Sequence, residues 1–180
     1  GRVLGGIPSA NEVCNDWNAA WEGGPATDAD LSRLHMAQAD AAGNIYIADK
    51  EGHAVRKVAL DETITTFAGT GLRGNGGEGV ANQINLREPN GLFTFPDGTT
   101  FILEVDDHCE SGVILSGGKI RRVAPNGMMT TLIDDPNLGI GRGLWVSPDE
   151  SLIYCCAGSV VRKWTPRAGI ETCSTGYVSL

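Results

Sequence analysis

One pattern of residues occurs three times along this chain, at 40–69, 96–133 and 148–173. Each occurrence begins with a turn-forming stretch rich in Asp, Gly, Asn or Pro and continues into a short apolar run. A second run follows, which carries Arg56, Arg121 or Arg162, and then a third run in which threonine recurs. A repeat of this kind constrains the architecture more than any single residue does, because each unit must bury its apolar face against the next.

The composition of each unit predicts antiparallel β-strands joined by tight turns. In the first unit, the run Ile45-Tyr-Ile47 lies between the turn residues Gly43-Asn44 and Asp49, and β-branched and aromatic residues bounded by turn formers are typical of strands. No stretch keeps an apolar period of 3.6, so long helices are not expected. Repeated units of this spacing indicate β-propeller blades. We therefore expect an all-β fold whose blades consist of four antiparallel strands.

The spacing of the repeat divides the chain into blades and locates one insertion. Gly43 and Gly98 lie 55 residues apart, whereas Arg56 and Arg121 lie 65 residues apart. The second unit therefore holds ten additional residues, which we place in a long loop at 106–118. Insertions in repeat proteins map to loops on one face, often the binding face. The predicted segments are an N-terminal piece and three blades: 1–22, 23–71, 72–135 and 136–180.

Four segments around the first unit resemble the bacterial form of the NHL-repeat family. They run from Gly23 to Leu31, Ala42 to Asp49, Gly52 to Val58 and Ile64 to Gly71. The second unit is similar to this pattern apart from its insertion. The third departs from it, because Cys155-Cys156 stands where the pattern favours a small residue and an acid. The resemblance implies a β-propeller and implies no particular reaction.

Three units are fewer than the four or more blades of a closed propeller, so we expect an incomplete ring in this chain. Arg2-Val-Leu-Gly5 is interpreted as the last strand of a preceding blade. Further blades of a longer polypeptide would complete the ring, or another chain would do so in an oligomer of three plus three blades. Open blade edges also allow strand addition between copies.

The charge limits the classes of partner. With 14 basic and 22 acidic residues, the formal net charge is −8, and no basic run exceeds a pair. Nucleic-acid binding through phosphates is therefore disfavoured. No apolar run approaches the length needed to span a membrane, so we expect no membrane span.

The five cysteines form no C-x-x-C pair, which disfavours a zinc ribbon or a thioredoxin-type motif. We consider a disulfide between Cys109 and Cys156, and a second between Cys14 and either Cys155 or Cys173. The alternative is that most of them are buried thiols that act as small hydrophobes. Because Cys14 and Cys109 lie in polar stretches, we favour an oxidising compartment and predict a secreted or periplasmic protein.

Candidate ligand-binding residues come from two sets of repeat positions. The innermost strands are expected to begin near 34–36, 89–91 and 141–143, which places one polar residue of each blade at the mouth of the central channel. The loops after the second strands reach the same rim. The alternative is that these polar groups only bond to loop backbone. The candidates are His35, Asn90, Arg142, Asp49, His53 and Glu104.

The insertion offers a candidate metal site at Asp106, Asp107 and His108. Carboxylates suit calcium or magnesium, and imidazole suits zinc, so a divalent cation such as calcium is the cofactor that we consider. The spacing matches neither an EF-hand nor a His-Glu-x-x-His motif. A solvated acidic loop is the alternative.

Three functional hypotheses follow. The first is a non-catalytic module that binds a protein or carbohydrate ligand outside the cytoplasm, because no nucleophile elbow is found. The second is a metal-dependent enzyme similar to propeller lactonases and amidating lyases, in which a metal at the channel mouth polarises a carbonyl or activates water. The third is a structural self-assembly module. The sequence alone does not decide whether the chain is an enzyme.

Overall fold

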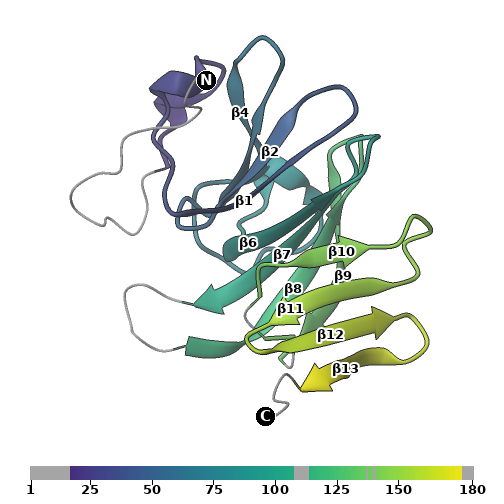
Figure 1. The fold of residues 1–180 in the computed structure, drawn as a ribbon. Coiled ribbons are helices and arrows are strands. Elements are labelled where there is room, and N and C mark those ends of the chain that lie inside the picture. The colour runs from purple at the N-terminus through teal and green to yellow at the C-terminus, as the bar shows by residue number, and fades with distance from the viewer. Residues whose placement is uncertain (1–16, 108–113, 137, 140, 176–180) are drawn as a thin grey trace, which may run out of the picture.

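The computed structural model describes residues 17–107, 114–136, 138–139 and 141–175. These residues form three antiparallel β-sheets together with short 3-10 helices, so the prediction of an all-β fold with four-stranded antiparallel units is confirmed. Figure 1 shows the sheets in chain order, from blue through teal to yellow. We call them blade 1, blade 2 and blade 3. No helix among the described residues is long and apolar enough to cross a membrane.

Blade 1 has the strand order β1-β2-β3-β4. Its first hairpin is closed by side-chain chemistry, since Asp40 accepts hydrogen bonds from the backbone N–H and the side-chain amide of Asn44 at 2.9 and 2.7 Å. Gly43 supplies the positive φ of 84° that this turn requires. The strands are β1 (Leu34–Ala39), β2 (Ile45–Asp49), β3 (Ala54–Val58) and β4 (Ile64–Gly69).

Blade 2 has the order β5-β9-β8-β7-β6. Part of the predicted loop at 106–118 is strand instead, because the backbone pairing of the central hairpin continues to Asp107 and Ile114. Residues 108–113 of that predicted loop lie outside the described residues. The strands are β5 (Gly79–Val80), β6 (Glu88–Thr94), β7 (Thr100–Asp107), β8 (Ile114–Val123) and β9 (Met128–Asp135).

Blade 3 has the order β10-β11-β12-β13. Its strand β11 alternates between two environments: Cys155 is buried in the core, whereas Cys156 is exposed. The alternation follows from the period of two residues along any strand. The strands are β10 (Leu144–Val146), β11 (Ile153–Ala157), β12 (Val160–Thr165) and β13 (Gly169–Thr175).

The segments that precede blades 1 and 2 run along the outer strands of those blades. Gly23 N–H donates to the Ile64 carbonyl at 2.8 Å, close to the 3-10 helices η1 (Ala19–Trp21) and η2 (Ala26–Asp28). In blade 2, β5 pairs with β9 just before the 3-10 helix η3 (Ala81–Gln83). Each of these segments therefore covers a sheet edge that would otherwise expose unpaired backbone groups.

Two apolar clusters hold the blades together. One joins blades 1 and 2 and includes Tyr46 and Leu92; the other joins blades 2 and 3 and includes Phe101 and Ile153. The inner strand β6 contacts β1 and β2 on one side and β10 on the other. This packing brings the innermost strands of the three blades, β1, β6 and β10, close to one another, as Figure 1 shows.

Candidate functional site

A cavity of about 360 Å³ lies where the first strands of the three blades meet. Each blade contributes one polar residue to its wall, and these three residues occupy equivalent positions of the repeat. Each directly precedes the residue that lies opposite the same point of the second strand: Met36 opposite Ala48, Gly91 opposite Leu103, and Gly143, whose carbonyl accepts from the Cys156 N–H at 3.0 Å. The lining residues are His35, Asn90, Gly141, Arg142, Gly143, Cys156 and Gly158.

Glycines create the space. Three of the lining residues are glycines. At Gly141, and at Gly91 next to Asn90, the facing backbone is too close for any side chain. A Cβ atom on Gly141 would lie 1.4 Å from the Cys156 carbonyl oxygen, and one on Gly91 would lie 2.4 Å from the Arg142 carbonyl oxygen. Blade 3 thus contributes three glycines to the wall together with Arg142 and Cys156, whereas blades 1 and 2 contribute His35 and Asn90.

His35, Asn90 and Gly141 form a hydrogen-bonded chain across the three blades. The side-chain N–H of Asn90 donates to the Gly141 carbonyl at 2.5 Å, which fixes the orientation of the amide. The Asn90 carbonyl oxygen therefore faces His35 Nδ1, so that nitrogen must carry the proton. Nε2 is left as the basic nitrogen of the ring. Asn90 is only 1% exposed, so this arrangement is well shielded.

Burial and nearby positive charge both favour the neutral form of His35. Burial lowers the pKa of His35, the Asn90 hydrogen bond opposes this, and the positive charges of Arg142, Lys50 and Arg33 lower it further. Arg142 itself is exposed and makes no hydrogen bond or ion pair within the described part of the chain. The cavity therefore combines a neutral imidazole with a guanidinium that is available to a ligand.

The other three predicted ligand-binding residues lie away from this cavity and have internal partners. Asp49 is buried, and its Oδ1 accepts a hydrogen bond from the Ser32 backbone N–H at 2.7 Å. His53 is also buried and donates from Nδ1 to the Arg87 carbonyl at 2.8 Å. The first contact holds the end of β2 against the segment before β1, and the second connects the turn after β2 to the segment before β6, so both residues have structural roles.

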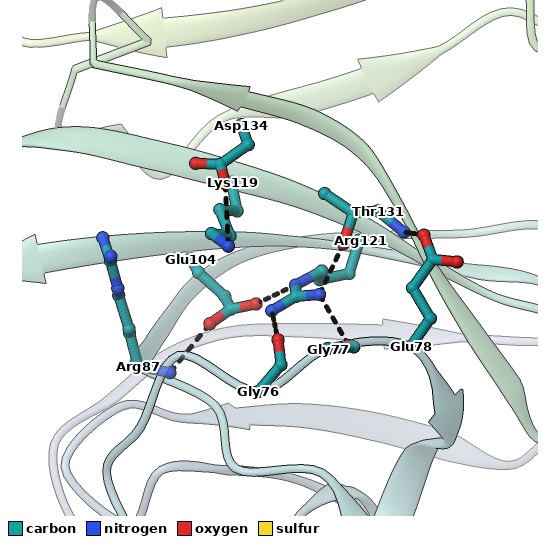
Figure 2. A network of polar contacts seen from close by, with 9 residues as sticks. All are labelled: Gly76, Gly77, Glu78, Arg87, Glu104, Lys119, Arg121, Thr131 and Asp134. Atoms are coloured by element: carbon teal, nitrogen blue, oxygen red, sulfur yellow. Dashed lines mark hydrogen bonds and ion pairs between the residues drawn. The ribbon is translucent and has the colours of Figure 1, made fainter.

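Glu104 belongs to a buried polar network in blade 2 (Figure 2). Its Oε1 lies 2.6 Å from Arg121 Nε, and its Oε2 accepts from the Arg87 backbone N–H at 2.7 Å. Arg121 also donates to the carbonyls of Gly76 and Gly77 at 2.6 and 2.9 Å. Both oxygens of Glu104 are therefore occupied inside the blade, and a role as an exposed ligand contact has no support from its geometry.

The candidate metal site lies largely outside what the structure describes. His108 falls outside the described residues, as do the side chains of Asp106 and Asp107, although the backbone of both aspartates belongs to β7. Among the described residues, no three His, Cys, Asp or Glu side chains lie close enough to hold one metal ion. The cavity offers one imidazole, one thiol, one amide and a guanidinium, a set that falls short of three such ligands and includes a repelling cation.

Cys156 is the cavity residue that was not selected from the sequence. The sequence comparison aligned Cys156 with the acid of the other units, but strand pairing shows that Ala157 takes that position, because Cys155 lies opposite Arg162 as Ile102 lies opposite Arg121. The structure has Cys155, Cys156 and Cys173 as free thiols, whereas Cys14 and Cys109 lie outside the described residues. The predicted disulfides stay predictions.

No family model and no curated relative matches the sequence, but solved structures do match the fold. A virginiamycin B lyase from Staphylococcus aureus matches with a TM-score of 0.51 and 15% identity over 79% of this chain and 42% of its own. A streptogramin B lyase matches with 0.51 and 13% over 77% and 39%. A gluconolactonase from Xanthomonas campestris matches with 0.55 and 17% over 79% and 49%. The chain therefore has a β-propeller fold and spans less than half the length of these structures.

Proposed function

We propose that this chain contributes three blades to a propeller enzyme that opens an ester or lactone bond of a small substrate at the channel mouth. The observation that carries the proposal is the single cavity lined by His35, Asn90 and Arg142, one residue from each blade. The lyases and the gluconolactonase that share the fold support an enzymatic reading. The NHL assignment and the extracytoplasmic location remain predictions of the sequence.

The geometry supports base-promoted addition of water to a carbonyl carbon. His35 is neutral and carries its basic lone pair on Nε2, so it accepts the proton of the attacking water. Arg142 supplies positive charge that stabilises the negative charge developing on the carbonyl oxygen. The acyl–oxygen bond then breaks, and the proton returns to the leaving oxygen, which gives a hydroxy acid from a lactone or an acid and an alcohol from an ester. Asn90 is a positioning residue, because it fixes the tautomer of His35.

The proposed reaction uses no metal ion, since the described residues of the cavity do not form a metal-binding set. A non-catalytic binding module would use the same cavity and differs from the enzyme in one observable, which is turnover. Both hypotheses need the remaining blades, or a partner chain, to surround the ligand fully.

The test is hydrolysis of glucono-δ-lactone by the full chain, followed through acid release and corrected for spontaneous opening. His35→Gln is expected to lower kcat at least a hundredfold, which is about the smallest effect of losing a general base. Gln83→Ala, an exposed substitution in η3, serves as the control and should leave the rate unchanged. Wild-type rates in the His35→Gln variant would contradict the proposal, and lactone binding without turnover would favour the binding module.

The pH dependence gives a second readout. A base works only when it is neutral, and the pKa of His35 is lowered by burial. The rate should therefore stay constant down through neutral pH and fall with a midpoint below about 6.5, the usual imidazole value. Asn90→Ala should lower kcat and move this midpoint, whereas a purely structural role of Asn90 would leave the midpoint in place.

A further inference from the structure

Blades 1 and 2 each protect their outer strand with a segment that runs beside it, which we call a strap. In blade 1 the strap is 22–26: Gly23 N–H donates to the Ile64 carbonyl at 2.8 Å, and Ile64 N–H donates to the Gly24 carbonyl at 2.9 Å. In blade 2 the strap is 76–81, which includes β5 paired with β9. Without a strap, an outer strand presents a row of unpaired backbone groups.

Each strap carries a glutamate that bonds to the backbone of the outer strand. Glu22 Oε2 accepts from the Thr66 N–H at 2.8 Å, and Glu78 Oε1 accepts from the Thr131 N–H at 2.8 Å (Figure 2). The two threonines are equivalent, because each lies opposite the arginine of the third strand beside a register shift. A carboxylate on this N–H is therefore a feature that the chain uses in both blades.

The straps also bind the arginine of the third strand. Arg56 donates from Nη2 to Glu22 Oε1 at 2.6 Å. Arg121 donates from Nη1 and Nη2 to the carbonyls of Gly77 and Gly76 at 2.9 and 2.6 Å. Both arginines are fully buried, so the oxygen atoms of the strap replace the water that a guanidinium loses on burial.

Blade 3 repeats this outer strand and has no strap in the described part of the chain. Arg162 lies opposite Thr172 at the same register shift and donates to its hydroxyl, but it makes no other hydrogen bond or ion pair with the described residues. Strand β13 ends its sheet, and none of the described segments pairs with its outer edge. The connection before blade 3, at 136–143, runs to the cavity wall instead.

This edge is positively charged, in contrast to the chain as a whole. The hairpin of β12 and β13 carries Arg162, Lys163 and Arg167 and a single acid, Glu171, whereas the formal net charge of the chain is −8. An acidic segment is therefore attracted to it. None of these residues lines the cavity, so the edge is a separate surface. A second copy offers no free strap among its described residues, because both straps are bound within their own blades.

We propose that the outer edge of β13 is a docking site for an extended acidic peptide of a partner protein. The peptide adds a strand to blade 3 by pairing with the backbone of Ile170, the residue equivalent to Ile64 of blade 1. Its glutamate accepts from the Thr172 N–H and pairs with Arg162, as Glu22 does in blade 1. Main-chain pairing at a free sheet edge is a general mode of peptide recognition. The inference goes beyond the proposed function, which concerns the cavity.

The probe is a fluorescently labelled peptide with the sequence of residues 20–30, which contains the blade 1 strap, titrated with the full chain and followed by fluorescence anisotropy. The strap of blade 1 is part of the same chain and holds its own site, so saturable binding of the peptide reports on the free edge. The same peptide with Glu22→Gln should bind about tenfold more weakly, because it loses the hydrogen bonds of the carboxylate.

Two variants of the chain form a matched pair, since each removes one positive charge. Arg162→Gln should lower the affinity for the peptide about tenfold. Lys163→Gln should leave it within about threefold, a difference under 1 kcal/mol, because Lys163 pairs with Glu171 at 3.1 Å. Thr172→Pro removes the backbone donor at an edge position, where proline is tolerated, and should abolish binding. Thermal unfolding shows that the variants fold.

No binding of the peptide at millimolar concentration, or equal losses in Arg162→Gln and Lys163→Gln, would overturn the inference. If Thr172→Pro does not fold, hydrogen exchange of the wild type replaces it: the amides of Ile170 and Thr172 should exchange more slowly with the peptide present, and unchanged exchange would contradict the site. Sedimentation tests the other occupant, since a dimer of this chain that Arg162→Gln dissociates would identify a second copy and overturn the proposed partner.

Discussion

Blades 2 and 3 share one repeat and treat the interior of the second and third strands in opposite ways. In blade 2, Arg121 is fully buried and bonds to Glu104, Thr131 and two backbone carbonyls. In blade 3, Arg162 is partly exposed and bonds to the Thr172 hydroxyl. Blade 2 closes its interior with a saturated ion pair, whereas in blade 3 the position equivalent to Glu104 is the buried Ala157, so Arg162 has no such acid.

The difference shows that one unit of a repeat can serve stability while another leaves space for a ligand. A buried ion pair contributes only when every polar group is satisfied, and breaking it from one side leaves an uncompensated charge. Blade 2 meets that condition and lies between the two apolar clusters. Blade 3 does not meet it, since Arg162 Nε has no partner, and its side of the cavity combines three glycines with Cys156 and the exposed Arg142.

The largest expected effect is the difference in stability between variants of Arg121 and of Arg162. Arg121→Ala should lower the free energy of unfolding by about 3–5 kcal/mol, because Glu104 would remain buried without its partner. The matched change Arg162→Ala removes one hydrogen bond to an exposed hydroxyl and should cost about 1 kcal/mol. Urea unfolding monitored by tryptophan fluorescence measures both. Equal losses would show that the two blades are energetically alike and that the comparison fails.

A smaller effect on stability is expected from adding a side chain where two strands lie very close together at the cavity. In Gly141→Ala the new Cβ atom would collide with the Cys156 carbonyl, so β10 and β11 must move apart at a cost of about 3 kcal/mol. Gly127→Ala meets no neighbouring atom and should cost about 1–2 kcal/mol for its positive φ alone. The same unfolding assay ranks the two variants, and a reversed order would mean that the strands separate easily at this point.

The smallest effect concerns the two adjacent thiols of β11. Burial raises the pKa of Cys155 to about 11, so at pH 8 only about a thousandth of it is the reactive thiolate. Cys156 and Cys173 are exposed and should react with a thiol reagent at least tenfold faster. Peptide mapping of the labelled protein identifies each site. Protection of Cys156 under non-reducing conditions, lifted by reductant, would instead support its predicted disulfide.

The sequence predicted the repeat, the antiparallel strands and the equivalence of His35, Asn90 and Arg142, because strand alternation and turn chemistry are local properties. It did not separate these residues from Asp49, His53 and Glu104, since all six were assigned to one rim. The internal partners of these residues distinguish the two groups: Glu104 pairs with Arg121, and His53 bonds to the Arg87 carbonyl. Such partners lie 17 to 34 residues away and depend on the packing of strands and blades.

By itself, the sequence determined the unit of architecture. Periodic turn residues and apolar runs specify strands wherever they occur, so the repeat could be recognised without coordinates. The tertiary structure alone decided that His35, Asn90 and Arg142, one from each blade, line the same cavity. That proximity arises because β6 packs against the first strands of both neighbouring blades, and packing between blades leaves no signal in the spacing of residues along one blade.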